Sequence, residues 1–336
     1  MYITHTNSVY SEEIDLLDHI PYPQYVHKVG NGGMPVEQGI KIMPMQLIDY
    51  VLTGKCGADK GTYDFVSSLA SPNQSKIGFI LAAGNNSWTG YLTTVLRSDS
   101  YPSYRIPVMG ISQVQAGYIA NQLGSFDYIS TDSTSCVSGH SAWYTAKNML
   151  TLGVLNAVVV ISVDNGLSEE YLSIFGESGL SKLVHEENDK SVKKFRLGHG
   201  CNVTVFESLT SIVKSGNIPL AEVMSMHIAS EYHGNPLGIS PLGEGYKKVI
   251  DKVDTNGINF VKTHNTFSDD NQVEKRILEE KFGNIRLVSY KLRIGHTMGA
   301  STAIETALAI KEESGKFLSL GAGMGNVFSS AVVDIL

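Results

Sequence analysis

Three side chains with the chemistry for acyl transfer each follow an expected strand in the 336-residue sequence. Cys136 lies in TSCVSG, a turn of small residues between an expected strand and an expected helix. His264 and His296 each follow a later expected strand, in VKTHNTFS and KLRIGHTMGAS. A thiolate is a nucleophile and an imidazole can donate or accept a proton, so together they favour catalysis through a covalent thioester.

The surroundings of Cys136 support this interpretation. Its turn opens a helix expected over residues 138–153, whose free N–H groups and positive dipole end would favour the thiolate and hold an oxyanion. Alone, a cysteine among serine and threonine residues is more often a small core residue, and a single histidine after a strand is more often structural. A thiol and two histidines at corresponding strand ends favour a shared site.

Strands and helices alternate along the chain, which favours a sheet covered by helices. In the first half we expect strands at 77–84, 128–136, 157–165 and 202–207, with helices after Pro107 as far as Leu123 and over 138–153. In the second half we expect strands at 221–230, 258–264, 286–290, 316–326 and 329–336, with helices over 244–253, 270–283 and 303–315. We therefore divide the chain into 1–209, with the thiol, and 210–336, with both histidines, as two similar α/β layers rather than one larger sheet.

Composition excludes several classes of protein. A net charge of -7 and a pI near 5.8 argue against broad binding to nucleic acid or an anionic membrane. We see no signal-peptide pattern and no apolar run that could span a bilayer, and expect a cytoplasmic protein. The cysteines are odd in number and widely spaced, which suits neither a disulfide framework nor a zinc site: Cys56, Cys136 and Cys201. The Gly-rich stretch 320–326 opens no helix and is no dinucleotide fingerprint.

Four stretches resemble the β-ketoacyl synthase, or ketosynthase, branch of the thiolase-like superfamily. Residues 130–142, STDSTSCVSGHSA, resemble its nucleophile turn, and 195–207, FRLGHGCNVTVFE, resemble the Gly-rich segment that closes the first half. Residues 263–274, THNTFSDDNQVE, resemble the first-histidine motif, and 291–305, KLRIGHTMGASTAIE, resemble the lysine-to-second-histidine motif. The resemblance extends from about Ile77 to the C-terminus.

The resemblance implies a layered αβαβα fold of two βαβαβαββ halves and a decarboxylative Claisen condensation. Cys136 would take an acyl group from a carrier-protein or coenzyme A thioester. A malonyl-type thioester would then lose CO₂ while His264 and His296 donate hydrogen bonds to its thioester oxygen, and the enolate would attack acyl-Cys136. Phosphopantetheine carries the implied substrates, with no further cofactor and no metal. The implied partners are an acyl carrier protein or acyl-CoA and a second ketosynthase-like chain, in a homodimer or heterodimer of fatty-acid or polyketide-type biosynthesis.

Further roles follow from matching positions in these motifs. Lys291, five residues before His296, matches the family lysine, and Glu305, nine residues after that histidine, matches the glutamate that pairs with it. For these two residues the alternative is a surface ion pair. The phosphopantetheine arm and the oxyanion would be bound by the hydroxyls of Thr266 and Ser268 and by the backbone N–H groups of Cys136 and Ala322.

The chain departs from the family pattern at several points. Asn265 follows the first histidine where the family has glycine, and Ala322 stands where elongating synthases place an aromatic gate residue. His199 replaces an expected acid, and the chain is short between Glu170 and Phe195. These departures indicate a specialised member rather than an ordinary elongation enzyme.

The sequence leaves two alternatives open and argues against a third. A non-catalytic partner similar to a chain-length factor would usually lack the thiol that Cys136 provides. A class-III-like initiating synthase would use asparagine where this chain has His296, and a thiolase would need a cysteine after Cys201, which the sequence lacks. Docking of an acyl carrier protein is a separate hypothesis, and the alternative is that these residues form a solvated loop. The hypothesis rests on the basic residues Lys190, Lys193, Lys194, Arg196, Lys247, Lys248 and Arg293.

Overall fold

The computed structural model describes residues 1–10, 48, 52, 61–71, 76–84, 111–165, 197–236, 238–266 and 271–336. The strands are β1 (Tyr2–Tyr10), β2 (Ile77–Ala82), β3 (Tyr128–Asp132), β4 (Ala157–Asn165), β5 (His199–Glu207), β6 (Ala221–Ser230), β7 (Ile258–Lys262), β8 (Arg286–Val288), β9 (Lys316–Gly323) and β10 (Val327–Ile335). The helices are α4 (Gly61–Leu69), α7 (Ser112–Leu123), α8 (Ser138–Thr151), α10 (Leu209–Ser215), α11 (Glu244–Ile250), α12 (Asn271–Phe282), α13 (Lys291–Ile294) and α14 (Ser301–Glu312), with short 3₁₀ helices η2 (Ser135–Val137) and η3 (Met298–Ala300).

The strand order repeats itself. Strands β1 to β5 lie in the order β3-β2-β4-β5-β1, and β6 to β10 continue as β6-β10-β9-β7-β8, which is the same order read from the other end. In both groups the last strand runs antiparallel to its neighbour, while the strands joined through helices run parallel. The chain therefore contains two βαβαβαββ halves, as expected.

The two halves are joined by hydrogen-bonded strands as well as by packing. Strands β1 and β6 pair antiparallel at Tyr2 with Glu222 and at Ile3 with Ala221. All ten strands consequently form one continuous sheet. The two expected layers are present, but they are joined into one larger sheet by the two residue pairs at the start of β1.

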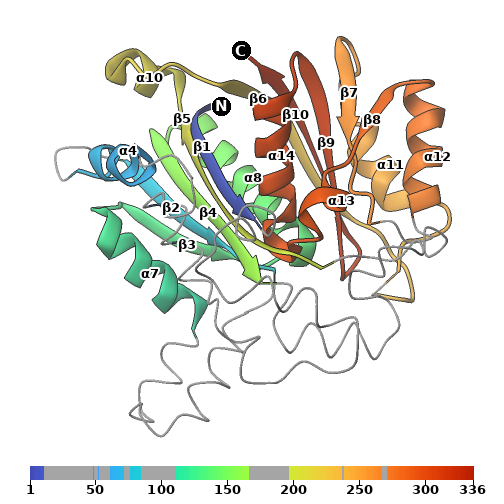
Figure 1. Ribbon diagram of the computed structural model, residues 1–336, viewed down its shortest axis with the longest axis horizontal. Coiled ribbons are helices and arrows are strands. Elements are labelled where there is room, and N and C mark those ends of the chain that lie inside the picture. Colours follow the sequence, from blue (N-terminus) through green and yellow to red (C-terminus); the bar gives the residue numbers. More distant parts are fainter. Residues whose placement is uncertain are drawn as a thin grey trace, which may run out of the picture.

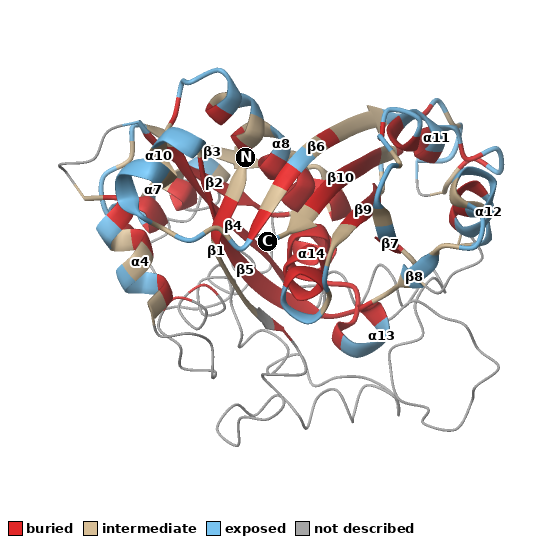
Figure 2. Cartoon of the chain, turned by 90° about the horizontal axis from the view of Figure 1, so that it is seen from above, coloured by how far each residue is buried: buried red, intermediate tan, exposed pale blue. Residues whose placement is uncertain are grey.

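Two helices form the middle layer of the molecule. Helix α8 contacts β2 and β4 of the first half and β6 and β10 of the second, and α14 contacts β1 and β5 as well as β7 and β9. Figure 1 shows both helices between the two groups of strands. Helices α4 and α7 cover the outer face of one group, and α11 and α12 cover the other, with exposed residues facing outward in Figure 2. The result is the predicted αβαβα layering.

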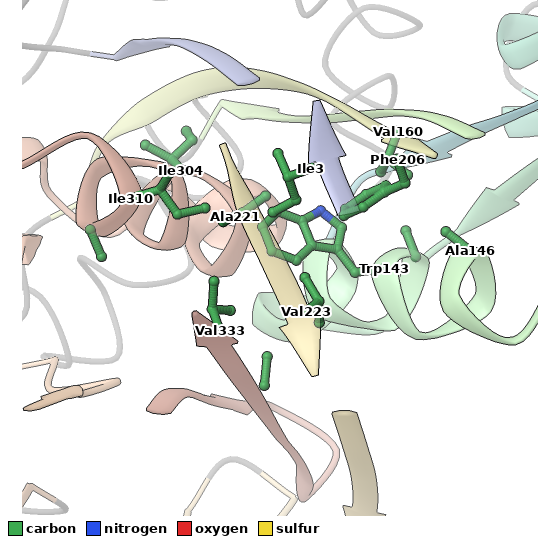
Figure 3. Packing of buried hydrophobic residues seen from close by; sticks show 14 of the residues in the cluster. Ile3, Trp143, Ala146, Val160, Phe206, Ala221, Val223, Ile304, Ile310 and Val333 are labelled. Carbon is green, nitrogen blue, oxygen red and sulfur yellow. The ribbon is translucent and has the colours of Figure 1, made fainter. Parts of the chain in front are cut away.

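The middle layer is held by a core that draws on both halves. Trp143 of α8 is fully buried and meets the ring of Phe206 edge-on, with 5.1 Å between centroids. Ile3, Ala221 and Val223 surround the same indole (Figure 3). Because α8 and α14 are fixed together, the turns at their N-termini, η2 and η3, contact each other. This contact brings the thiol of the first half to the second half.

Most expected elements are confirmed, with shifts of a few residues at their ends. The apolar runs at 77–84 and 157–165 form β2 and β4, and the expected strand at 221–230 forms β6 at the same bounds. The strand expected over 128–136 ends at Asp132, where the nucleophile turn begins. Strand β1 and the helices α4, α10 and α13 were not expected.

Candidate active site

The nucleophile turn is held in a strained shape by local hydrogen bonds. Ser135 has a φ of 53°, in the left-handed region that non-glycine residues rarely adopt. The Ser138 hydroxyl donates to the Ser135 carbonyl at 2.7 Å and accepts from the Thr134 N–H at 2.8 Å. These bonds place Cys136 in η2, directly before the first turn of α8, with 5% of its surface exposed.

The end of β9 lies directly against this turn. A Cβ at Gly323 would lie 3.3 Å from the backbone nitrogen of Cys136, which is closer than most Cβ atoms approach a neighbouring atom. The backbone N–H of Met324 lies close enough to the Cys136 thiol to lower its pKa. The second half therefore supplies a main-chain donor beside the sulfur, and the residue that supplies it is two positions after Ala322.

Burial makes the thiol the favoured form of Cys136. Burial raises the pKa of the Cys136 thiol above its ordinary value, and the nearby carboxylate of Asp164 raises it further. A hydrogen bond with the Ser135 hydroxyl, at 3.6 Å, the charge of Lys291 and the Met324 N–H oppose this rise. The expectation that the helix N-terminus favours the thiolate here is wrong, because burial is the largest influence on this pKa and raises it.

The two histidines are neighbours. The rings of His264 and His296 meet edge to face, with 5.4 Å between centroids and 85° between planes. Both are buried, and burial lowers the pKa of each imidazole well below its ordinary value, helped by the charge of Lys291. Both imidazoles are therefore neutral at pH 7, and a neutral imidazole carries one N–H that can donate to a substrate oxygen.

His264 is positioned through its backbone. The Glu274 carboxylate, from the first turn of α12, accepts the His264 N–H at 2.6 Å and the Asn265 N–H at 2.9 Å. Asn265 does not have a positive φ, so its backbone conformation does not require a glycine at this position. Within the described part of the chain, Nδ1 of His264 is buried without a hydrogen-bond partner. A buried nitrogen in that state is what a group awaiting substrate would present.

His296 is positioned from both halves of the chain. Its Nδ1 lies 2.7 Å from the Ser301 hydroxyl, at the start of α14. If this hydroxyl donates, the imidazole proton lies on Nε2. The His296 carbonyl accepts from the Gly198 N–H at 3.0 Å, and a Cβ at Gly198 would come 2.3 Å from the Ile294 carbonyl oxygen. The Gly-rich segment of the first half thus fixes the second histidine.

A buried ion-pair cluster lies behind the histidines. Lys291 contacts the Glu305 carboxylate, and both side chains are buried, which excludes the alternative of a surface ion pair. Glu305 also lies 3.4 Å from Nζ of Lys262, a fully buried lysine at the end of β7. Lys262 was not expected at the site from its sequence position, because a lysine at a strand end ordinarily reaches solvent.

Asp164, at the end of β4, ties the two halves together beside the site. Its carboxylate oxygen Oδ2 accepts the N–H groups of Gly84 and Gly299, each at 3.0 Å. Gly84 follows β2 and Gly299 lies in η3, three residues after His296. A Cβ on Gly299 would stand 1.9 Å from the Gly84 nitrogen, so the two backbones are in direct contact.

The remaining predicted residues lie in different parts of the molecule. Thr266 lies near the histidines, and its N–H donates to Asn271 at 2.9 Å. Ala322 is buried in β9, opposite Phe328 of β10. Of the basic residues considered for docking, Arg293 pairs with Glu312 at 2.6 Å on the surface. Ser268 lies outside the described residues, as do Lys190, Lys193, Lys194 and Arg196.

The comparisons with known proteins agree with this architecture. No family model matches the chain. It is 23% identical over 201 residues to "3-oxoacyl-[acyl-carrier-protein] synthase 2" of Rhizobium meliloti (strain 1021), across 53% of this chain and 47% of that protein. The chain therefore matches about half the length of this curated relative.

Solved structures match over more of the chain. "The ishigamide ketosynthase/chain length factor" has a TM-score of 0.73 at 14% identity, covering 100% of this chain and 98% of that one. The fold is that of the thiolase-like ketosynthases. A ketosynthase from module 6 of the bacillaene synthase of Bacillus subtilis 168 gives 0.69 at 14% identity, covering 100% of this chain and 72% of that one. A type II polyketide synthase ketosynthase in complex with its acyl-carrier protein matches with a TM-score of 0.67 at 16% identity, and 78% of each chain is covered.

One structural observation bears on membranes. Among the described residues, no helix combines the length and the apolar character that a bilayer-spanning segment requires. The cytoplasmic location stays a prediction, as do the domain boundary at residue 209 and the roles of the individual site residues.

Proposed function

We propose that this chain is a ketosynthase-type acyltransferase that forms a carbon–carbon bond by decarboxylative Claisen condensation. The observation that carries the proposal is the gathering of Cys136, His264 and His296 around Lys291. The charge of this one lysine lowers the pKa of the thiol and of both imidazoles, so all three lie within its electrostatic reach. The ketosynthase fold and the curated relative support the same reaction class.

In the first step, Cys136 takes the acyl group. Its sulfur attacks the carbonyl carbon of an acyl thioester, the bond from that carbon to the carrier's sulfur breaks, and the thiol proton passes to the departing thiolate. The developing oxyanion is held by backbone donors, for which the Cys136 N–H and a donor from the turn after β9 are suited. The Ala322 N–H is the proposed second donor, and the Met324 N–H, two residues further along the chain, lies beside the sulfur.

In the second step, a malonyl-type thioester supplies the nucleophile. The bond to its carboxylate breaks and CO₂ leaves, and the electron pair forms an enolate whose oxygen receives hydrogen bonds from His264 and His296. The enolate carbon attacks acyl-Cys136, the carbon–sulfur bond breaks, and the sulfur takes a proton from solvent. Neutral imidazoles suit this role, since each can donate without transferring its proton.

The proposed substrates reach the site on phosphopantetheine, with Thr266 and Ser268 as the proposed contacts for that arm. For partners we propose an acyl carrier protein, or acyl-CoA, and a second ketosynthase-like chain. The printed descriptions of two neighbours support this, since one is a ketosynthase with its acyl-carrier protein and the other a ketosynthase/chain length factor. Strand β3 pairs only with β2 within the described residues, and its other edge is a candidate for pairing with a second chain.

A non-catalytic, chain-length-factor-like role is the second candidate. It is favoured by the similarity to the ketosynthase/chain length factor structure, whose matched chain is covered almost completely. It is opposed by the presence of Cys136, His264 and His296 together. A class-III-like initiating synthase is a third candidate, and the second histidine argues against it.

The two half-reactions separate these roles. Acyl transfer to Cys136 is measured with an acyl thioester alone, and condensation is measured by adding a malonyl thioester to the preloaded protein. We expect Cys136→Ala to lose acylation, and His264→Ala or His296→Ala to keep acylation while condensation falls at least about a hundredfold.

The result that would overturn the proposal is equally specific. Equal loss of both half-reactions in the histidine variants would assign the imidazoles to thiol activation or to folding instead. Wild-type protein that is folded and acylated yet never condenses would favour the non-catalytic candidate. The matched control is His227→Asn, which alters a partly buried histidine on β6.

A further inference from the structure

Lys262 is the most unusual charged group near the histidines. Its side chain is fully buried at the last residue of β7, two residues before His264. Nζ donates to the Leu320 carbonyl at 2.6 Å and lies 3.4 Å from Oε2 of Glu305. Burying a charged lysine to this extent costs free energy of desolvation, which must be offset by partners for its charge.

The contacts of Lys262 join the elements that carry the reacting groups. Leu320 lies in β9, four residues before Met324, whose N–H reaches the Cys136 sulfur. Glu305 lies in α14, the helix that follows the His296 loop. One ammonium group therefore ties the ends of β7 and β9 to the middle-layer helix.

Glu305 serves two ammonium groups at once. Its Oε1 contacts Lys291 while its Oε2 faces Lys262, so this triad carries a net positive charge when both lysines are protonated. Glu274 is the other carboxylate acting on Lys262, but backbone N–H groups occupy both of its oxygens. His140, His264 and His296 complete the titratable groups around Lys262.

We propose that Lys262 is a positioning residue for condensation, which through the shared Glu305 keeps positive charge behind the His264–His296 pair. The proposal rests on the decarboxylative function proposed above and names a residue which that function does not require. As CO₂ leaves, negative charge grows on the thioester oxygen between the imidazoles. A fixed positive charge in a buried site stabilises that enolate and keeps both imidazoles unprotonated.

The pH range of the effect follows from the same burial. Burial lowers the pKa of Lys262 from 10.5 to about 8, with the charge of Lys291 adding to the fall and Glu305 opposing it. Lys262 is therefore charged at pH 7 and loses its charge as the pH rises through about 8. Condensation should weaken over this range while acylation does not follow the same profile.

The test compares wild-type protein with Lys262→Met, which keeps the length and removes the charge, and with Lys262→Arg, which keeps the charge. Lys147→Met is the matched control, because Lys147 also donates to a backbone carbonyl, Val223 at 2.9 Å, but has no part in the cluster. Two readouts are used on the full chain: condensation by acyl-loaded protein from pH 6.5 to 9.5, and histidine titration by NMR.

We expect wild-type condensation to fall through about pH 8. In Lys262→Met we expect it to be about tenfold slower at pH 7 and flat across that range, while the pKa values of His264 and His296 rise by about one unit. Lys262→Arg and Lys147→Met should resemble wild type at pH 7. A Lys262→Met variant with the wild-type profile and unchanged histidine titrations would overturn the proposal.

Two further outcomes are separable. Should Lys262→Met fail to fold, the wild-type profile decides, since no fall in condensation near pH 8 contradicts the proposal. Should wild-type protein fail to condense at all, the proposed function is what fails. The histidine titrations, which need no substrate, would then still accept or reject the electrostatic role of Lys262.

Discussion

The junction between Gly84 and Gly299 allows a sharp prediction about how the two halves form one site. In Gly299→Ala the new Cβ would lie 1.9 Å from the Gly84 nitrogen and 2.5 Å from its Cα. Both are backbone atoms, so no side chain can rotate away. Reaching even 3.0 Å, a separation that real Cβ atoms essentially never go below, would require the two backbones to separate by about 1.1 Å.

That separation breaks hydrogen bonds to a buried charge. Gly84 and Gly299 both donate to Oδ2 of Asp164 at 3.0 Å, and a shift of this size takes at least one of these bonds beyond hydrogen-bonding distance. A hydrogen bond to a charged group contributes about 1.5–3 kcal/mol, and the carboxylate stays buried. We expect Gly299→Ala to lower the free energy of unfolding by about 3–5 kcal/mol.

The assay is urea unfolding of the full chain, with condensation measured on the fraction that stays folded. Because η3 begins two residues after His296, condensation should suffer more than acylation. The matched control is Gly117→Ala in α7, where an added Cβ meets no atom within 4 Å. There the free energy of unfolding should rise by about 0.5–1 kcal/mol. A Gly299→Ala variant within 1 kcal/mol of the control would refute the reasoning.

Three further predictions use the same structure. The rate at which iodoacetamide alkylates Cys136, measured by mass spectrometry, should be low at pH 7 and still rising at pH 9, because burial raises the pKa of the thiol. A rate that reaches a plateau below pH 8 would contradict this. The pKa of Lys262 is lower in the folded protein than in the unfolded chain, so the unfolded chain binds more protons between pH 8 and 10.5. The contribution of Lys262 to the free energy of unfolding should therefore rise across that range. Urea unfolding at each pH should show this rise in the wild type and not in Lys262→Met. Trp143→Ala should cost about 3–5 kcal/mol by the same measurement, since the indole fills the core between the halves, and a cost below 1 kcal/mol would argue against that core.

The parts of the fold that the sequence predicts are those with continuous apolar runs. AVVVISVDN forms β4 because both of its faces are buried: Val158 and Val160 belong to the core that includes α8, and Val159 and Ile161 belong to the core that includes α4 and α7. Such apolar runs can be recognised in the sequence without knowing the neighbouring strands. Strand β1 was missed because polar pairs contribute to its pairing with β5. Thr6 lies 3.1 Å from Thr204, and Asn202 donates to Thr6 and to the Asn7 carbonyl, so the strand lacks the apolar alternation that would indicate burial.

The candidate site was predictable in the same measure. Cys136, His264 and His296 can be identified from the sequence because thiol and imidazole groups at strand ends indicate a catalytic site. The spacing of Lys291 and Glu305 predicts their contact. Lys262 carries no such signal, since its importance comes from burial against α14 and β9, which lie 43 and 58 residues further along the chain. The protonation of Cys136 was misjudged for a related reason, because desolvation depends on tertiary packing.

Acylation of Cys136 is the most direct test of the central claim. Folded full-length protein is incubated with a panel of acyl thioesters, and its peptides are examined by mass spectrometry beside those of Cys136→Ala. The account predicts one acyl group on the peptide that contains Cys136, absent from the variant, and its release as a β-ketoacyl thioester when a malonyl thioester is added. Folded protein that leaves Cys136 unmodified by every acyl thioester would contradict the account.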